Sequence, residues 1–133
     1  MKEVAAAIAM SEGKVLVTRR AAGQKLAGYW EFPGGKLEPG EDVQTCIERE
    51  LQEELGVSST AGEVLTISDY SYPGGAISLI AIKVSLHSSD FTLTVHDKYA
   101  WKAPGELLEL NLALADIPIA EKLRTTEKKD LQA

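Results

Sequence analysis

The stretch from Gly35 to Val57 constrains this 133-residue chain more than any other. It contains three glutamates, Glu50, Glu53 and Glu54, at positions i, i+3 and i+4. A helix turns by about 100° per residue, so these side chains fall within a sector of roughly 100° on one face. Clustered carboxylates repel one another, and a divalent cation removes that penalty. Because all-oxygen ligation suits hard ions such as Mg²⁺ or Mn²⁺, which usually hold phosphate oxygens, the stretch predicts a metal and phosphate site.

The whole chain has the size and composition of a single soluble domain, spanning residues 1–133. Its net charge of −6 argues against binding to nucleic acid backbones. The single cysteine, Cys46, excludes an intrachain disulfide and suits a reducing compartment. No apolar run approaches the roughly 18 residues of a membrane span. We therefore expect a cytoplasmic monomer or homodimer that takes a small-molecule nucleotide, with neither a nucleic acid polymer nor a membrane as partner.

Hydrophobic patterning predicts strands before and after one central helix. The helix is expected over residues 42–55, because Ile47, Leu51 and Leu55 recur every four residues and Gly56 suits a left-handed C-terminal position. The expected strands cover residues 4–10, 15–18, 29–32, 63–72, 76–86, 91–95 and 99–101. A short helix is expected over 104–110, a second helix over 115–125 and a frayed tail over 126–133. This order predicts an α/β fold built in layers.

The spacing Gly-x5-Glu-x7-Arg-Glu-Leu-x-Glu-Glu-x-Gly-Val resembles the signature of the Nudix hydrolases at every fixed position. The resemblance implies the Nudix α/β/α sandwich, with a mixed β-sheet and the motif as a loop-helix-loop. It also implies metal-assisted hydrolysis of a nucleoside diphosphate linked to another group. A solvated acidic helix face is the alternative, but such a face does not need glycines and an arginine at set distances.

The resemblance also assigns roles to matching residues. It implies that Glu50, Glu53 and Glu54 bind the metals or orient the attacking water, and that the carbonyl of Gly35 adds a ligand. Arg49 is implied to orient these carboxylates, with a purely structural salt bridge as its alternative. One of Glu53 and Glu54 is implied to be the general base, and the sequence does not say which.

Two further segments, residues 30–36 and 112–118, resemble the MutT-type nucleoside triphosphate pyrophosphohydrolases. This resemblance implies that Arg20 and Lys36 contact substrate phosphate, although a surface charge is as good a reading of Arg20. It implies that Asp116 hydrogen-bonds the base, with helix capping as the alternative. As a carboxylate Asp116 accepts from exocyclic amino groups, and as a protonated acid it donates.

Aromatic side chains near these segments are candidates for the base pocket. Phe32 and Tyr72 have faces on which a nucleobase stacks, with core packing as the alternative for Phe32.

One position departs from the family pattern. Many members carry a glutamate six residues before a tryptophan that matches Trp101, and here that position is Val95. Either Asp97 replaces the missing acid after a local register change, or the helix carboxylates suffice. His96 and His87 are expected to be exposed loop residues.

The leading hypothesis is a Mg²⁺-dependent enzyme, with Mn²⁺ as a possible substitute, that converts a nucleoside triphosphate to the monophosphate and pyrophosphate. Its role would be nucleotide-pool sanitising, with 8-oxo-dGTP, CTP, dCTP or modified cytosine nucleotides as candidate substrates. The alternatives are a hydrolase of ADP-ribose or dinucleoside polyphosphates, and a Nudix module that senses a nucleotide without cleaving it.

Overall fold

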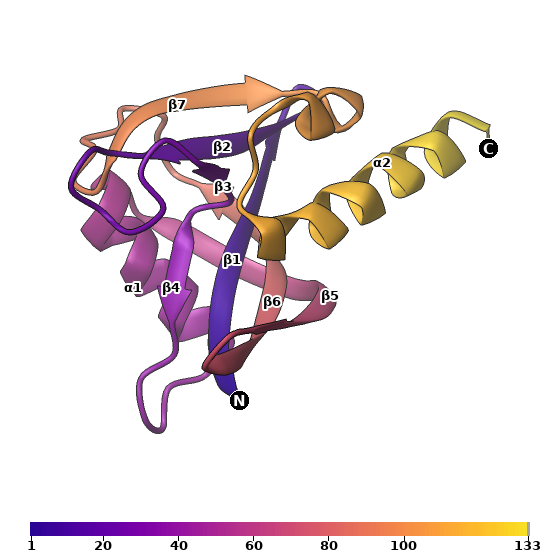
Figure 1. Cartoon of the computed structure of the whole chain (residues 1–133). Coiled ribbons are helices and arrows are strands. Elements are labelled where there is room, and N and C mark those ends of the chain that lie inside the picture. Colours follow the sequence, from indigo (N-terminus) through magenta and orange to yellow (C-terminus); the bar gives the residue numbers. More distant parts are fainter. Residues whose placement is uncertain (133) are drawn as a thin grey trace.

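The computed structural model describes residues 1–132, and it describes side chains for residues 1–126. Two α-helices and seven strands form over this part of the chain, with two short 3₁₀ helices before the last α-helix (Figure 1). The elements in chain order are β1 (Lys2–Ser11), β2 (Lys14–Arg20), β3 (Trp30–Glu31), β4 (Gly34–Lys36), α1 (Val43–Leu55), β5 (Ser59–Tyr72), β6 (Gly75–Leu86), β7 (His96–Lys102), η1 (Pro104–Glu109), η2 (Leu114–Asp116) and α2 (Ile117–Gln132).

The sheet is mixed, as predicted. Its order is β3-β2-β1-β6-β5, with β4 paired to β1 and β7 paired to β2. β1 runs parallel to β6 from Lys2 opposite Ile77 to Ala9 opposite Val84, whereas its pairs with β2 and β4, and the pair of β2 with β7, are antiparallel. The strands expected over residues 4–10 and 15–18 form a hairpin, but β1 and β2 pair only at the turn before β2 continues with β3 and β7. The hairpin of β5 and β6 is confirmed along its length.

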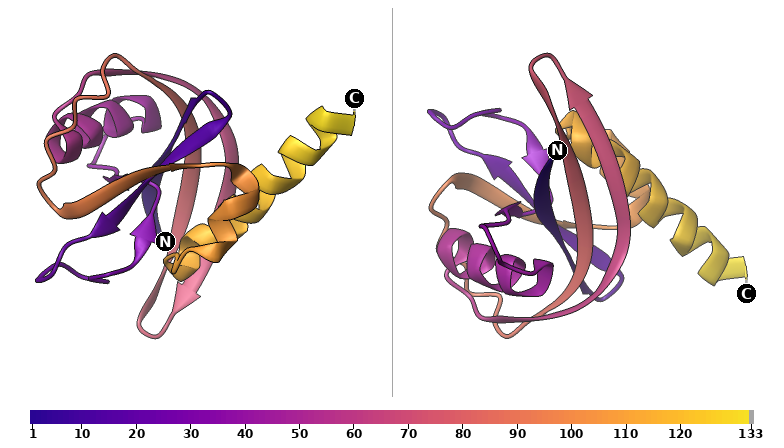
Figure 2. Two further views of the ribbon diagram at one scale, coloured as in Figure 1. Left: turned by 90° about the horizontal axis from the view of Figure 1, so that it is seen from above. Right: turned by 90° about the horizontal axis from the view of Figure 1, so that it is seen from below.

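The two α-helices cover opposite sides of the sheet (Figure 2). Alternate residues of β1 face opposite ways, so Ala5, Ala7 and Ala9 pack towards α1 while Ala6 and Ile8 pack on the α2 side. The small alanine side chains let α1 lie close to the strand, and Ala5, Ala7 and Ala9 bury apolar surface in one cluster with Ile47, Leu51 and Leu55. The predicted α/β/α sandwich is therefore confirmed.

Local signals fix the ends of α1 where the sequence predicts them. Asp42 precedes the first turn, and its carboxylate accepts a hydrogen bond from the Thr45 N–H at 2.7 Å. Gly56 ends the helix at φ 68°, a left-handed conformation that glycine adopts without a side-chain penalty. The three motif glutamates, Glu50, Glu53 and Glu54, are thus held on a helix with defined ends.

The strand predicted over residues 91–95 is wrong. This segment has no regular structure, because its backbone closes the C-terminal end of α1 instead of joining the sheet. The N–H of Thr92 donates to the Leu55 carbonyl at 2.9 Å, and the N–H of Thr94 donates to the Glu54 carbonyl at 3.3 Å. The backbone N–H groups of this β-prone segment therefore satisfy carbonyl groups at the C-terminal end of α1.

The C-terminal elements agree with the predictions in kind and differ in length. The short helix predicted over 104–110 is the 3₁₀ helix η1, and α2 continues to Gln132, beyond its predicted end at residue 125. The frayed tail predicted over 126–133 falls on residues that lie largely outside the described side chains. Among the described residues, no helix is long and apolar enough to cross a bilayer.

Candidate active site

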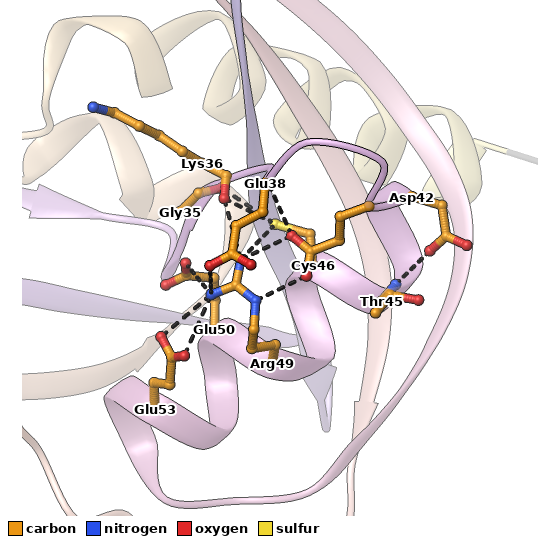
Figure 3. A network of polar contacts seen from close by, with 10 residues as sticks. Gly35, Lys36, Glu38, Asp42, Thr45, Cys46, Arg49, Glu50 and Glu53 are labelled. Carbon is orange, nitrogen blue, oxygen red and sulfur yellow. Dashed lines mark hydrogen bonds and ion pairs between the residues drawn. The ribbon is translucent and has the colours of Figure 1, made fainter.

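Arg49 is the centre of the acidic network on α1 (Figure 3). Its guanidinium binds Glu41 through two bonds of 2.8 Å, and it also donates to Glu50 at 2.9 Å and to Glu53 at 3.3 Å. The guanidinium also donates a hydrogen bond to the Lys36 carbonyl at 3.3 Å. Because five guanidinium N–H groups point in a fixed plane, one arginine holds several carboxylates in set directions. The predicted orienting role of Arg49 fits this geometry.

Glu41 is the strongest partner of this arginine. It is the first fixed acid of the motif, and its hydrogen bonds with Arg49 lower the pKa of its carboxyl group to about 2. Its carboxylate also accepts from the Glu38 N–H at 3.0 Å, which ties the loop before α1 to the network. The structural role of this fixed motif acid is therefore to anchor Arg49.

Glu50 lies directly against Gly35. A Cβ atom at position 35 would overlap the Glu50 carboxyl group, with both carboxylate oxygens only 2.6 Å away. Glycine is therefore required so that the strand backbone and the acid can approach each other. Burial raises the pKa of Glu50 above its usual value, while Arg49 opposes that shift.

A methyl group at this position is expected to displace Glu50. We expect Gly35→Ala to weaken the apparent Mg²⁺ affinity by about tenfold or more, as changes to groups that support metal ligands do. The free energy of unfolding should change little, because the displaced atoms end a flexible side chain. Mg²⁺ titration of activity measures the first effect and urea unfolding the second. Gly105→Ala is the matched control, since its Cβ would meet nothing within 4 Å. Equal Mg²⁺ dependence of the two variants would contradict the prediction.

Glu54 differs from its neighbours because it is buried. Its Oε1 atom is buried and has no hydrogen-bond partner among the described residues. Burial, followed by the nearby charges of Glu31 and Glu50, raises the pKa of Glu54 to about 8. A buried carboxyl without a partner is costly, and a cation at this point would relieve the cost.

The described residues do not hold a ready-made cluster of three or more acidic, histidine or cysteine side chains around one point. Arg49 draws Glu50 and Glu53 towards itself, whereas Glu54 faces Glu31. The acids nevertheless fit a divalent cation: they are hard oxygen donors on one helix, beside a carbonyl-bearing strand, and one of them has an unpartnered oxygen.

Asp116 and Phe32 come together although 84 positions separate them. Asp116 is 6% exposed, and its Oδ2 accepts the Phe32 N–H at 2.8 Å. Burial is the main cause that raises the pKa of Asp116 to about 8. The ring of Phe32 is 3% exposed and packs in the core on the α2 side, so core packing accounts for the ring while the backbone N–H holds Asp116.

The other predicted residues lie apart from the Arg49 network. Arg20 ends β2 and contacts Glu31, and the side chain of Lys36 is exposed and points away from Arg49 (Figure 3). Tyr72 is 39% exposed at the hairpin of β5 and β6, where it stacks on Tyr70. The structure thus joins Gly35, Arg49, Glu50 and Glu53, and separately joins Phe32 and Asp116.

Two predictions about the segment near Val95 need correction. His96 is not an exposed loop residue: it begins β7, is 4% exposed and donates to Glu31. Asp97 does not turn towards the carboxylates of α1, because its side chain forms a two-bond salt bridge with Arg19. His87 is exposed, as predicted. His96 was missed because no local signal shows which β7 residues face inwards, and Glu31 in β3 was missed because its partners Arg20 and His96 are distant in the sequence.

A cavity of about 830 Å³ lies between β5, β6 and the middle of α2. Its lining includes Ile8, Leu65, Val84 and Leu123 and none of the predicted site residues. We therefore place the candidate active site at Gly35 and α1 on the basis of its chemistry.

The mixed-sheet sandwich and the carboxylate-rich helix define the class that the motif predicts, a hydrolase that works with divalent cations. Residues 1–129 match the family described as the NUDIX domain. The chain is 43% identical to the CTP pyrophosphohydrolase of Escherichia coli (strain K12) over 91% of its own length and 90% of the relative. It is 37% identical to the 8-oxo-dGTP diphosphatase of the same organism, over 58% and 60% of the two chains.

Solved structures of related proteins share the fold of this chain. The solution structure of the E. coli ORF135 protein matches with a TM-score of 0.85 at 39% identity, covering 96% of this chain and 91% of that one. The MutT protein of Methanosarcina mazei Go1 also matches with a TM-score of 0.85, at 24% identity over 96% and 95% of the chains, which shows a shared fold. The chain belongs to the Nudix family.

Proposed function

We propose that this protein hydrolyses nucleoside triphosphates to the monophosphate and pyrophosphate, using a divalent cation. The observation that carries the proposal is the set of acids on α1, with Glu50 against Gly35 and Glu54 buried with an unpartnered oxygen. The likeness to a CTP pyrophosphohydrolase along nearly the whole chain supports the same reaction. With all motif acids in place, a module that only senses nucleotides is disfavoured.

The proposed metal ligands are Glu50, Glu53, Glu54 and the carbonyl of Gly35, with Mg²⁺ as the natural ion and Mn²⁺ as a substitute. When bound, the cation supplies charge neutralisation on phosphate oxygens and a lower pKa for an attached water. Arg49 orients the carboxylates of these glutamates. Either Glu53 or Glu54 takes the proton of the attacking water.

Arg20 and Lys36 are proposed to bind phosphate oxygens. The side chain of Lys36 is exposed. Arg20 uses Nε and Nη1 for bonds to the Lys25 carbonyl and Glu31, so among the hydrogen bonds of the described residues its Nη2 stays open to a ligand. In a chain with a net charge of −6, such cations and the metal are needed to attract a polyanionic substrate.

Asp116 is proposed to read the base. Phe32 holds it through its backbone N–H, and the exposed ring of Tyr72 is proposed as a stacking face. Oδ2 of Asp116 already accepts from Phe32, and the raised pKa of about 8 places a proton on the carboxyl group at neutral pH. That proton then belongs on Oδ1, where it is donated to an acceptor such as O6 of guanine. The ionised form would instead accept from N4 of cytosine. Both 8-oxo-dGTP and cytosine nucleotides therefore stay candidates, and nucleotide-pool sanitising is the proposed role.

The test is hydrolysis of a panel of nucleotides with Mg²⁺. Pyrophosphate release is measured for 8-oxo-dGTP, dGTP, CTP, dCTP and 5-hydroxy-dCTP, and AMP formation is measured for ADP-ribose, which yields no pyrophosphate. We expect one triphosphate to be preferred clearly, and its base identifies the group that Asp116 contacts. Cleavage of ADP-ribose alone would favour the alternative hydrolase, and no cleavage of any compound would favour the sensor. The cytoplasmic location and the monomer or homodimer state stay predictions.

A further inference from the structure

A β-bulge sets the direction of the side chains where β2 meets β7. Arg19 pairs with Lys98, but the next residue, Arg20, pairs with His96, so Asp97 is skipped. An extra residue in one strand shifts the alternation of side chains beyond it, and such bulges often re-aim side chains next to active sites. The consequence here is that Asp97 meets Arg19 at the surface, whereas His96 faces inwards with Arg20.

The inward-facing imidazole makes one hydrogen bond. Nε2 of His96 lies 2.9 Å from Oε2 of Glu31, and because a carboxylate only accepts, Nε2 carries the proton. The side chain is 0% exposed, and its Nδ1 is buried with no partner among the described residues. An apolar side chain would avoid that unpaired nitrogen, so packing alone does not explain a histidine here.

The carboxylate of Glu31, which His96 holds, also contacts Arg20. The same Oε2 atom accepts from Arg20 Nη1 at 3.3 Å, and Arg20 Nε donates to the Lys25 carbonyl at 3.0 Å. The loop that supplies this carbonyl folds back on β2, where the Gly28 N–H donates to the Arg20 carbonyl at 2.9 Å. Two of the guanidinium nitrogens are therefore fixed, and the hydrogen bonds of the described residues leave Nη2 unused.

Glu31 lies close to the proposed base pocket, because it directly precedes Phe32, whose N–H holds Asp116. Its charge contributes to the raised pKa of Glu54 on α1 and to the raised pKa of Asp116 in the proposed base pocket. Because Glu31 holds Arg20, the Arg20 guanidinium lies near the acids of α1 and near the proposed base pocket. A nucleotide whose base enters that pocket would bring its phosphates towards this guanidinium.

We propose that His96 is a positioning residue, which through Glu31 holds the guanidinium of Arg20 in place for the phosphates of the substrate. This inference rests on the proposed function and adds a residue that does not touch the substrate. It also explains the bulge: without it, Asp97 and not His96 would stand opposite Arg20.

His96→Leu is the first test variant, because leucine fills the buried space and removes the hydrogen bond. We expect its KM for the preferred triphosphate to rise about tenfold, with kcat much less affected, because binding geometry is lost while the acids of α1 are untouched. His96→Gln, which keeps an N–H donor, should recover part of the loss. His87→Leu is the matched control: His87 is exposed, contacts Thr60 at 2.7 Å and should keep the wild-type KM.

A double-mutant cycle separates positioning from general damage. In the Arg20→Ala background, His96→Leu should have almost no further effect on KM, because the group that it positions is absent. Additive effects on KM, or a wild-type KM in His96→Leu, would overturn the inference. Urea unfolding of each variant shows whether the fold is intact, and in a destabilised His96→Leu the Gln variant provides the comparison.

Binding of inorganic pyrophosphate with Mg²⁺, followed by calorimetry, keeps this test apart from that of the proposed function. If the wild type cleaves no triphosphate, the proposed function fails. His96→Leu should still weaken pyrophosphate binding by about tenfold if Arg20 is positioned as proposed. Unchanged pyrophosphate binding would overturn the inference whatever the enzyme cleaves.

Discussion

Replacing Glu53 by Gln is expected to lower kcat for triphosphate hydrolysis by about 10²–10⁴-fold, the usual contribution of a group that transfers a proton in the transition state. Glutamine keeps the size of the side chain and loses the charge and the basic oxygen. The fold should tolerate the change, because the Glu53 side chain is 58% exposed and contacts Arg49 only at 3.3 Å and 3.4 Å. Pyrophosphate release at saturating Mg²⁺ measures the effect, and urea unfolding checks the fold.

Glu48→Gln on the same helix is the matched control. Glu48 accepts the Ala61 N–H at 2.8 Å, a bond that a glutamine carbonyl also makes, and it takes no part in the Arg49 network. Its kcat should stay within about twofold of the wild type. If Glu53→Gln were as active as this control, Glu53 would be neither the general base nor a required metal ligand, and its proposed roles would be wrong.

The helix that carries the site was predictable because its determinants are local. Asp42, Gly56 and the four-residue repeat of Ile47, Leu51 and Leu55 all act within a few positions of one another, and α1 begins and ends within a residue of the predicted limits. The same holds for the hairpin of β5 and β6, which is closed by a short turn. Periodicity and capping decide such elements before any tertiary contact forms.

The segment from residue 91 to residue 96 was not predictable in this way. Its hydrogen bonds go to the end of α1, about 40 positions earlier, and a bulge that depends on pairing with β2 decides that His96 faces inwards. The contact between Phe32 and Asp116 is equally non-local. Tertiary contacts override local propensity at these points, and two of the three lie in the candidate site.

Asp116→Asn is expected to remove a pH dependence of stability. Asp116 has a pKa of about 8 in the folded protein, raised chiefly by burial, against about 4 in an unfolded chain. Between these values the folded state keeps a proton that the unfolded state loses, so the stabilising contribution is fully present below about pH 4 and is lost as the pH rises towards 8. Asparagine does not titrate, and its carbonyl still accepts the Phe32 N–H.

Urea unfolding at pH 5, 6 and 7 measures this difference. The free energy of unfolding of the wild type minus that of Asp116→Asn should fall by about 1.4 kcal/mol per pH unit, or about 3 kcal/mol over the range. Asp97→Asn is the matched control, because Arg19 lowers the pKa of Asp97, which is therefore ionised in both states throughout this range. Its difference from the wild type should be flat. A flat profile for Asp116→Asn as well would mean that Asp116 is ionised in the folded protein, and it would then accept from the base, as N4 of cytosine allows, instead of donating to it.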